Sequence, residues 1–374
     1  MRNTPVAGTA LVLLMSLASV AAQAQPAISS ASGQWSHSAS VTISGSGFGT
    51  KTTAAPSVWD DASGTNLSDK WDGWWPSAAS ASSNMAYRSV MRGIQPPHSR
   101  TGRYLAGNHV GEAADAGYNV MVWKRRTVTY PSSTYASWYV RMDDAWVFGG
   151  DNNFKNYAWS VGPEPYEGNY WYLEYNPRPT SRSSSCAWTL YDSGGMGLSP
   201  AMTWGDSCTN PMGGQWVKVE LFIRWSRSSD GFVQVYENGR RVVNYSGRTD
   251  NASGSTRVEG IGGYARIRNS NNWRYYTDIY LDTTLSHVIL GNASTLSAST
   301  KREVQVPTAW SNNSITANVN LGAFANGQTA YLYVFDSNGN ANPTGYPVTI
   351  SGGSGSTTPQ APVNLRVTVP PPTS

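Results

Sequence analysis

Three segments of the sequence alternate apolar residues with polar or aromatic ones, so one side of each segment presents groups that can do chemistry. They are YASWYVRMDDAW (135–146), NYWYLEYNP (169–177) and WVKVELFIRW (216–225). Alternate side chains share a face in an extended chain. If the three phases hold, one side of a sheet carries Tyr139, Arg141, Tyr170, Tyr172, Lys218 and Arg224.

Groups of this kind are suited to β-elimination from a polysaccharide that contains uronic acids. The reaction needs a cation or an amide to neutralise the uronate carboxylate, and a Tyr or His to move the proton at C5. His98 or His109 could reach the same side from the preceding loops. For a lyase, the predicted catalytic residues are Tyr139, Arg141, His109 and Tyr172.

The same side chains can bind a glycan without cleaving it. Aromatic rings stack on the apolar faces of sugars, while charged and amide groups bond to the hydroxyls. The stretch from 152 to 177 has seven Tyr and Trp residues around Lys155, Asn156 and Glu174. Trp159 and Trp171 could instead be core residues between two sheets. The predicted substrate-binding residues are Arg141, Lys155, Tyr157, Trp159, Tyr170, Tyr172, Glu174, Lys218 and Arg224.

The sequence disfavours glycoside hydrolysis and zinc-dependent chemistry. A retaining glucanase needs two carboxylates on alternate strand positions, as in Glu-x-Asp-x-x-Glu, and the chain has no such motif. The four histidines are scattered, so no zinc site and no cofactor is expected. A structural calcium ion bound by DDAW (143–146) or GGDNN (149–153) is one expectation, although loop Asp and Asn usually form turns.

The amino-acid composition limits the classes of molecule that the protein is expected to bind. Charged residues are 13% of the chain and the formal net charge is +4, whereas Trp (16) and Tyr (21) are abundant. Lys and Arg form no stripe, which disfavours nucleic acid, but a weakly basic face could attract an acidic polysaccharide. The partner expected is therefore a polysaccharide.

The first residues have the pattern of a targeting segment. Residues 1–24 combine Arg2, the apolar run AGTALVLLMSLASV and a small-residue AQA site, which is typical of a signal peptide. We therefore expect a secreted or periplasmic protein without membrane insertion. In an exported protein, Cys186 and Cys208 are expected to form a disulfide.

The spacing of turn residues predicts an all-β chain, with a hairpin at Asn238-Gly239 and about a dozen strands between residues 57 and 285. The order of GQWVKVELFIRW, VYENGRRVVNYSG and YYTDIYLDTT resembles the concanavalin A-like lectin/glucanase jelly roll. That resemblance implies a jelly roll over residues 56–285, a fold that also includes polysaccharide lyases. Two short signatures associated with alginate lyases, Gln-Ile-His and Tyr-Phe-Lys-Ala-Gly, are missing.

The stretch VTISGSGFG (41–49) looks like the start of a small immunoglobulin-like sandwich, and WSNNSITANV (310–319) looks like a later strand of one. Both resemble IPT/TIG domains. The resemblance implies a discontinuous domain, residues 27–55 and 286–350, with the jelly roll inserted in it. Alternatively, the N-terminal strand decorates the jelly roll. Residues 351–374 form a Gly/Ser/Pro-rich tail.

Taken together, the sequence favours an exported, lectin-like protein that binds a polysaccharide through an aromatic and charged sheet face. One alternative is a lyase that cleaves an acidic polysaccharide. A second alternative is a structural protein of an extracellular matrix or filament, in which the immunoglobulin-like domain provides self-assembly or a cell-surface contact.

Overall fold

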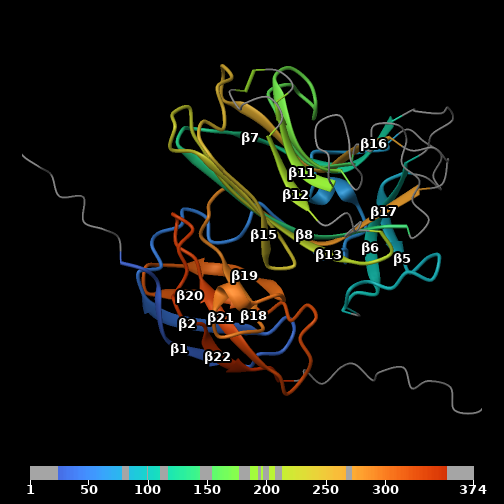
Figure 1. Cartoon of the computed structure of the whole chain (residues 1–374). Coiled ribbons are helices and arrows are strands. Elements are labelled where there is room, and N and C mark those ends of the chain that lie inside the picture. Colours follow the sequence, from blue (N-terminus) through green and yellow to red (C-terminus); the bar gives the residue numbers. More distant parts are fainter. Residues whose placement is uncertain are drawn as a thin grey trace, which may run out of the picture.

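The computed structural model describes residues 24–77, 84–98, 100–109, 117–143, 154–176, 186–192, 195–196, 202–206, 213–266 and 272–351. The predicted signal peptide, apart from Ala24, and the tail beyond Ser351 lie outside these residues. Within them the regular structure is β, except for two short 3-10 turns, η1 (Leu67–Asp69) and η2 (Leu296–Ala298). The predicted fold class is confirmed: a large jelly-roll sandwich stands beside a smaller β-sandwich (Figure 1).

One sheet of the jelly roll, here called the front sheet, has seven strands. In spatial order they are β12 (Met202–Asp206), β11 (Cys186–Asp192), β10 (Tyr170–Asn176), β9 (Phe154–Ser160), β16 (Thr256–Arg266), β7 (Gly117–Thr127) and β4 (Gly73–Trp75).

The other sheet, the back sheet, has eight strands, seven of them along its main path. They are β15 (Arg240–Ser246), β14 (Phe232–Glu237), β13 (Val217–Trp225), β8 (Ser132–Met142), β17 (Asn272–Asp282), β6 (Arg103–His109) and β5 (Ala86–Ser89), and β3 (Val58–Asp60) pairs with β17 off this path.

The core of the jelly roll lies between the two sheets and is built from the predicted apolar faces. Trp138, Val140 and Met142 of β8 are fully buried there, as are the alternate residues of β10 and β13. Trp159 stacks on Trp225 across the gap, with ring centroids 3.6 Å apart. The expectation that Trp159 and Trp171 could be core residues is therefore confirmed.

The predicted hairpin is formed by β14 and β15. Asn238 (φ 46°) and Gly239 (φ 77°) occupy its tip, as the two central positions of a two-residue turn of this type require. A side chain at Gly239 would meet the carbonyl oxygen of Ser299 at 2.1 Å. The tip thus needs glycine both for its backbone and for its contact with the smaller sandwich.

The smaller unit, here called the terminal sandwich, joins strands from the two ends of the chain. Its order is β1 (Ala27–Gly33), β2 (Ser40–Ser46), β20 (Ser314–Asn318), β19 (Arg302–Trp310), β18 (Val288–Gly291), β21 (Thr329–Val334) and β22 (Tyr346–Thr349). Val41 and Ile43 of β2 pack with Ile315, Ala317 and Leu332 in one core. Membership of the IPT/TIG family stays a prediction.

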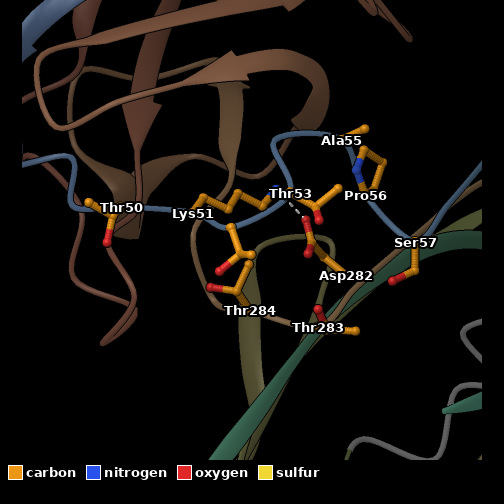
Figure 2. A pocket seen from close by; sticks show the side chains of 10 residues that line it. Thr50, Lys51, Thr53, Ala55, Pro56, Ser57, Asp282, Thr283 and Thr284 are labelled. Carbon is orange, nitrogen blue, oxygen red and sulfur yellow. Dashed lines mark hydrogen bonds and ion pairs between the residues drawn. The ribbon is translucent and has the colours of Figure 1, made fainter. Parts of the chain in front are cut away.

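Two connections between the units run side by side (Figure 2). Residues 50–57 leave the terminal sandwich, and Asp282 to Thr284 return toward it, with Lys51 and Asp282 forming a buried ion pair of 2.6 Å between them. Thr53 lies beside this pair, and Thr50 and Thr284 belong to the same two connections (Figure 2).

The outer face of the back sheet packs against the terminal sandwich. Tyr135 and Phe222 of the jelly roll share one cluster with Ile289 and Phe335. His287 stacks between Tyr135 (3.5 Å) and Phe335 (4.1 Å). One outer face of the jelly roll is therefore an interface between the two units.

In the part of the chain that the structure describes, we find no helix with the length and apolar character needed to span a membrane.

Candidate functional site

The outer face of the front sheet is rich in aromatic side chains. Trp75 and Trp123 contact each other at 4.8 Å between ring centroids. Beside them lies a group of tyrosines, here called the tyrosine face: Tyr166, Tyr170, Tyr172, Tyr191 and Tyr264. The rings of Tyr170 and Tyr172 are stacked at 6.3 Å, and Tyr172 lies 5.1 Å from Tyr191. This arrangement extends over adjacent strands and the loop that joins β9 to β10.

Lys155 lies within the tyrosine face. Its ammonium nitrogen is 4.0 Å from the ring centroid of Tyr172, 4.5 Å from that of Tyr166 and 5.0 Å from that of Tyr264. Only 9% of the residue is exposed. Aromatic rings attract a cation through their negative faces, and the attraction grows as water is excluded. We call Lys155 and these three tyrosines the lysine cage.

A β-bulge in β9 places Lys155 on this face. Leu173 pairs with Tyr157, but Glu174 pairs with Lys155, so Asn156 is an extra residue in β9. Without the bulge, Lys155 and Tyr157 would lie on the same face because they are two residues apart. With it, Tyr157 points into the core while Lys155 points outward.

A second irregularity in β16 completes the cage. The pairing of β16 with β9 shifts between Ile261 and Ala265, across Gly262 and Gly263. Gly263 has a φ of +145°, and a side chain there would lie 2.0 Å from the hydroxyl of Tyr166 and 3.0 Å from Cβ of Lys155. Glycine at this position therefore lets Tyr166 approach Lys155.

The surroundings of Lys155 hold it in place. From the core side, the guanidinium of Arg274 donates a 2.7 Å hydrogen bond to the carbonyl oxygen of Lys155 and lies 3.7 Å over the ring of Phe154. The hydroxyl of Tyr166 is buried, and burial raises its pKa well above the usual value. Tyr166 therefore stays protonated and acts as a fixed wall of the cage.

Glu174 brings a carboxylate to the same face. It is opposite Lys155 in the strand pairing and is 1% exposed. Its Oε1 accepts a 3.2 Å hydrogen bond from the side-chain amide of Asn176. The face thus combines a cation and phenol groups, which can bond to the carboxylate and hydroxyls of an acidic sugar, while the Glu174 carboxylate is buried next to Lys155.

The structure divides the predicted site between two sheets, which corrects the expectation of one common side. Tyr170, Tyr172, Lys155 and Glu174 lie on the front sheet. Tyr139, Arg141, Lys218 and Arg224 belong to the back sheet, on the far side of the core. Strand alternation separates inward from outward residues but does not say to which sheet a strand belongs.

On the back sheet, two of the predicted residues meet the terminal sandwich. The hydroxyl of Tyr139 donates a 2.6 Å hydrogen bond to Glu303, and the ammonium of Lys218 is 3.9 Å from the same carboxylate. Arg141 donates to the carbonyl oxygen of Gly214, and Arg224 pairs with Asp230 at 3.1 Å. These contacts hold the back sheet together and join it to its neighbour.

Three further predictions need correction. Tyr157 and Trp159 are fully buried in the core, where they donate hydrogen bonds to Glu259 (2.5 Å) and Asp250 (2.7 Å). His109 lies in β6 rather than in a loop, is fully buried, and shares the inward phase of Leu105. A substrate at the tyrosine face cannot touch these side chains.

Sequence reasoning did not single out Tyr166 or Tyr264. Tyr166 follows Gly-Pro-Glu-Pro in a loop, and its positive φ of 66° is unusual for a tyrosine. Tyr264 follows Gly-Gly, a pair that signals a strand irregularity. That glycine pair is the signal that could have indicated the site.

The predicted disulfide and metal site are only partly covered by the described residues. Cys186 is buried at the start of β11, whereas Cys208 lies outside them, as do Asp144 and residues 149–153. Asp143 accepts hydrogen bonds from the hydroxyl of Tyr275 (2.8 Å) and the backbone amide of Trp273 (2.9 Å). Among the described residues, no group of three or more His, Cys, Asp or Glu is placed to hold a metal ion.

Comparisons with known proteins find similarity in structure only. No family model and no curated protein sequence matches the chain. A glucuronan lyase from the fungus Trichoderma reesei is similar over 62% of this chain and 96% of its own, with 14% identity and a TM-score of 0.41. An alginate lyase from a Chlorella virus covers 53% of this chain and 89% of its own, at 12% identity and a TM-score of 0.34. The receptor-binding domain of botulinum neurotoxin type G covers 68% of both chains, at 11% identity and a TM-score of 0.30.

Proposed function

We propose that the protein is a lyase that cleaves an acidic polysaccharide on the tyrosine face. The observation that carries this proposal is the lysine cage, in which one ammonium lies 4.0–5.0 Å from the ring centroids of three tyrosines on the outer side of a sheet. The proposal rests on these residues rather than on the structural similarities, although two of those proteins are named as lyases of glucuronan and alginate.

The substrate class follows from the charges. Tyrosine rings stack on sugar rings, and an ammonium among them pairs with a carboxylate better than with a hydroxyl. A uronate residue offers both an apolar ring face and a carboxylate. Lys155 would therefore bind the uronate carboxylate while Tyr170 stacks on a neighbouring sugar.

The reaction class is β-elimination, which needs no water, metal or redox partner in its balance. The C5–H and C4–O4 bonds break, a C4=C5 double bond forms, and the proton from C5 is returned to the leaving O4 oxygen. Lys155 neutralises the carboxylate and so stabilises the negative charge that develops next to C5.

Tyr172 is the residue that we assign to the proton transfer. Of the three cage tyrosines, its ring is nearest to the ammonium of Lys155. A neighbouring cation stabilises the phenolate that forms when a tyrosine gives up its proton. In this role Tyr172 would take the C5 proton and pass it to O4 on the same side of the sugar ring.

Binding without cleavage is the second candidate. The continuous contacts from Tyr166 through Tyr170 and Tyr172 to Tyr191 form a platform of the kind that glycan-binding proteins use, and such a platform needs no turnover. This candidate keeps the same surface and the same ligand class.

Incubation of the protein with glucuronan, alginate, polygalacturonate and a neutral glucan tests the proposal. A lyase releases products with a C4=C5 double bond, whose ultraviolet absorbance rises with time on a uronate polymer and not on the neutral glucan. Tyr172→Phe should lower the rate about 100-fold and leave affinity nearly unchanged. Binding without any unsaturated product, in wild type as in the variant, would support the binding candidate instead.

A further inference from the structure

A groove lies where the hairpin of the back sheet meets the terminal sandwich. Its volume is about 770 Å³, and its walls include Tyr236, Arg240 and Arg241 from the jelly roll and Thr295, Ser297 and Arg302 from the terminal sandwich. We call it the junction groove. It is on the side of the jelly roll opposite the tyrosine face, because β14 and β15 belong to the back sheet.

The floor of the junction groove is fixed by Arg302. This side chain is buried, and its guanidinium donates to Glu220 (3.2 Å) and to the carbonyl oxygens of Gly239 (3.0 Å) and Leu296 (2.7 Å). It also lies 5.1 Å from the ring centroid of Tyr236. Residues of both units are thus held in one arrangement, so the groove depends on their contact.

The rim of the groove is positive. The lining residues include three arginines and no carboxylate. Arg240 and Arg241 are exposed, and Arg240 lies 3.9 Å from Glu237. Among the residues that the structure describes, no carboxylate lies within 4.0 Å of the guanidinium of Arg241.

We propose that the junction groove is a second binding site for an acidic polysaccharide chain. Its guanidinium groups match the carboxylates of such a chain, Tyr236 offers an aromatic surface, and the exposed hydroxyls of Thr295 and Ser297 can bond to sugar hydroxyls. The groove has no counterpart of the lysine cage, so its role is to hold polymer rather than to cleave it. A chain held there raises the effective concentration of its other segments at the tyrosine face.

Charge reversal at the rim tests this site in the full-length protein. Arg241→Glu should weaken binding of polymeric alginate or polygalacturonate about tenfold, since it replaces an attraction with a repulsion. Arg248→Glu is the matched control, because Arg248 is an exposed arginine that follows β15 and does not line the groove. Affinity is measured by titration at low and at high salt, and the difference between the two variants should shrink at high salt.

Two further comparisons decide the outcome. Combined with Lys155→Met, Arg241→Glu should still weaken binding by about the same factor as it does alone, since the groove then holds the polymer by itself. Equal affinity of Arg241→Glu and Arg248→Glu for the polymers would overturn the proposal. Double-stranded DNA that binds as tightly as the polyuronates, with the same dependence on Arg241, would also overturn it, because the rim would then be a general polyanion surface.

Failure of this site and failure of the lyase proposal give different results. The groove is tested by binding, whether or not any unsaturated product forms. If product forms and the two arginine variants bind alike, the groove proposal alone is wrong. If no product forms and Arg241→Glu still binds more weakly than its control, the lyase proposal alone is wrong.

Discussion

Each outer face of the jelly roll has a lysine beside a tyrosine, but the two pairs have different surroundings. On the front sheet, Lys155 lies 4.0 Å from the ring centroid of Tyr172, and on the back sheet, Lys218 lies 4.5 Å from that of Tyr139. The cage tyrosines around Lys155 all come from the jelly roll itself. Lys218 and Tyr139 instead share Glu303, a residue of the terminal sandwich.

The difference shows that a lysine beside a tyrosine does not identify a ligand site. The back face carries buried ionisable groups that are paired across or beside the interface, including His98 with Asp278 at 2.6 Å and Arg302 with Glu220 at 3.2 Å. A buried charge needs a partner because water is not there to solvate it. The terminal sandwich provides such partners on the back face. On the front face, the ammonium of Lys155 lies among the rings of three tyrosines of the jelly roll itself.

Exchange of each lysine for methionine should separate the two faces most strongly. Lys155→Met removes the cation that neutralises the uronate, and we expect it to lower the rate of product formation about 1,000-fold. Lys218→Met should leave the rate per folded molecule unchanged and lower the free energy of unfolding instead. Initial rates on a uronate polymer and urea unfolding curves measure the two effects.

Lys124→Met is a control on the front sheet, because Lys124 pairs with Asp72 outside the cage. It should keep full activity. An active Lys155→Met protein would remove Lys155 from the mechanism, and an inactive but stable Lys218→Met protein would reopen the back face as the site.

Much of the fold could be predicted because the inward phase of each strand is a local property. Trp138, Val140 and Met142 alternate with polar residues, and the structure buries all three. Which sheet a strand joins is decided by pairing with distant residues, such as that of Lys218 with Tyr139. The sequence pattern therefore predicted the outward groups of β8, β10 and β13 and could not separate the two faces.

The site was harder to predict because a bulge in β9 brings Lys155 to it. Regular alternation puts Lys155 and Tyr157 on one face, whereas the extra residue Asn156 puts them on opposite faces. In β16 the pairing with β9 shifts across Gly262 and Gly263, where the absent side chain lets Tyr166 approach Lys155, while Tyr264 keeps the outward phase that alternation from Ile261 gives it. A bulge inverts the alternation of the residues that follow it in the strand. A prediction that misses the bulge therefore assigns those residues to the wrong face, core or surface.

The ion pair of His98 and Asp278 should contribute strongly to stability. Asp278 is fully buried, and Asp278→Asn would remove the charge that faces His98. Breaking one side of a buried pair costs about 3 kcal/mol of unfolding free energy. Urea unfolding of the full chain measures this.

The matched control is Asp230→Asn, which alters the exposed pair of Asp230 with Arg224. It should leave the unfolding midpoint unchanged. Equal effects of the two substitutions would contradict the view that burial at the interface makes the difference.

Two histidines beside the terminal sandwich should respond to pH in opposite directions. Burial lowers the pKa of His287 to about 3, so an unfolded chain binds a proton there before the folded one does, and stability falls as pH drops below about 6.5. Burial opposes protonation of His98 too, but the charge and hydrogen bond of Asp278 outweigh it and raise the pKa of His98. Its contribution is present below about pH 6.5 and is lost as pH rises through the raised value.

The pH dependence of variants separates these two contributions. Between pH 7 and pH 5, His287→Phe should remove about 2 kcal/mol of acid destabilisation. His98→Gln should instead reduce the loss of stability between pH 6 and pH 8. The unfolding free energy of wild type and of each variant is measured at both pH values, and the change between them is compared. If His287→Phe loses as much stability as wild type between pH 7 and pH 5, His287 is not buried in its neutral form.

The smallest effect concerns stacking on the tyrosine face. Tyr170 is half-buried and lies 6.3 Å from Tyr172, so its ring contributes contact area to a bound sugar without touching Lys155 in the cage. Tyr170→Ala should weaken binding of a uronate oligosaccharide by about 1 kcal/mol, close to a fivefold change in affinity. Tyr245→Ala is the control, because Tyr245 is a half-buried tyrosine of β15 in the back sheet whose hydroxyl donates to the carbonyl oxygen of Arg248. Titration should show a loss of affinity for Tyr170→Ala but not for Tyr245→Ala. Equal losses of affinity in both variants would mean that the sugar does not stack on the tyrosine face.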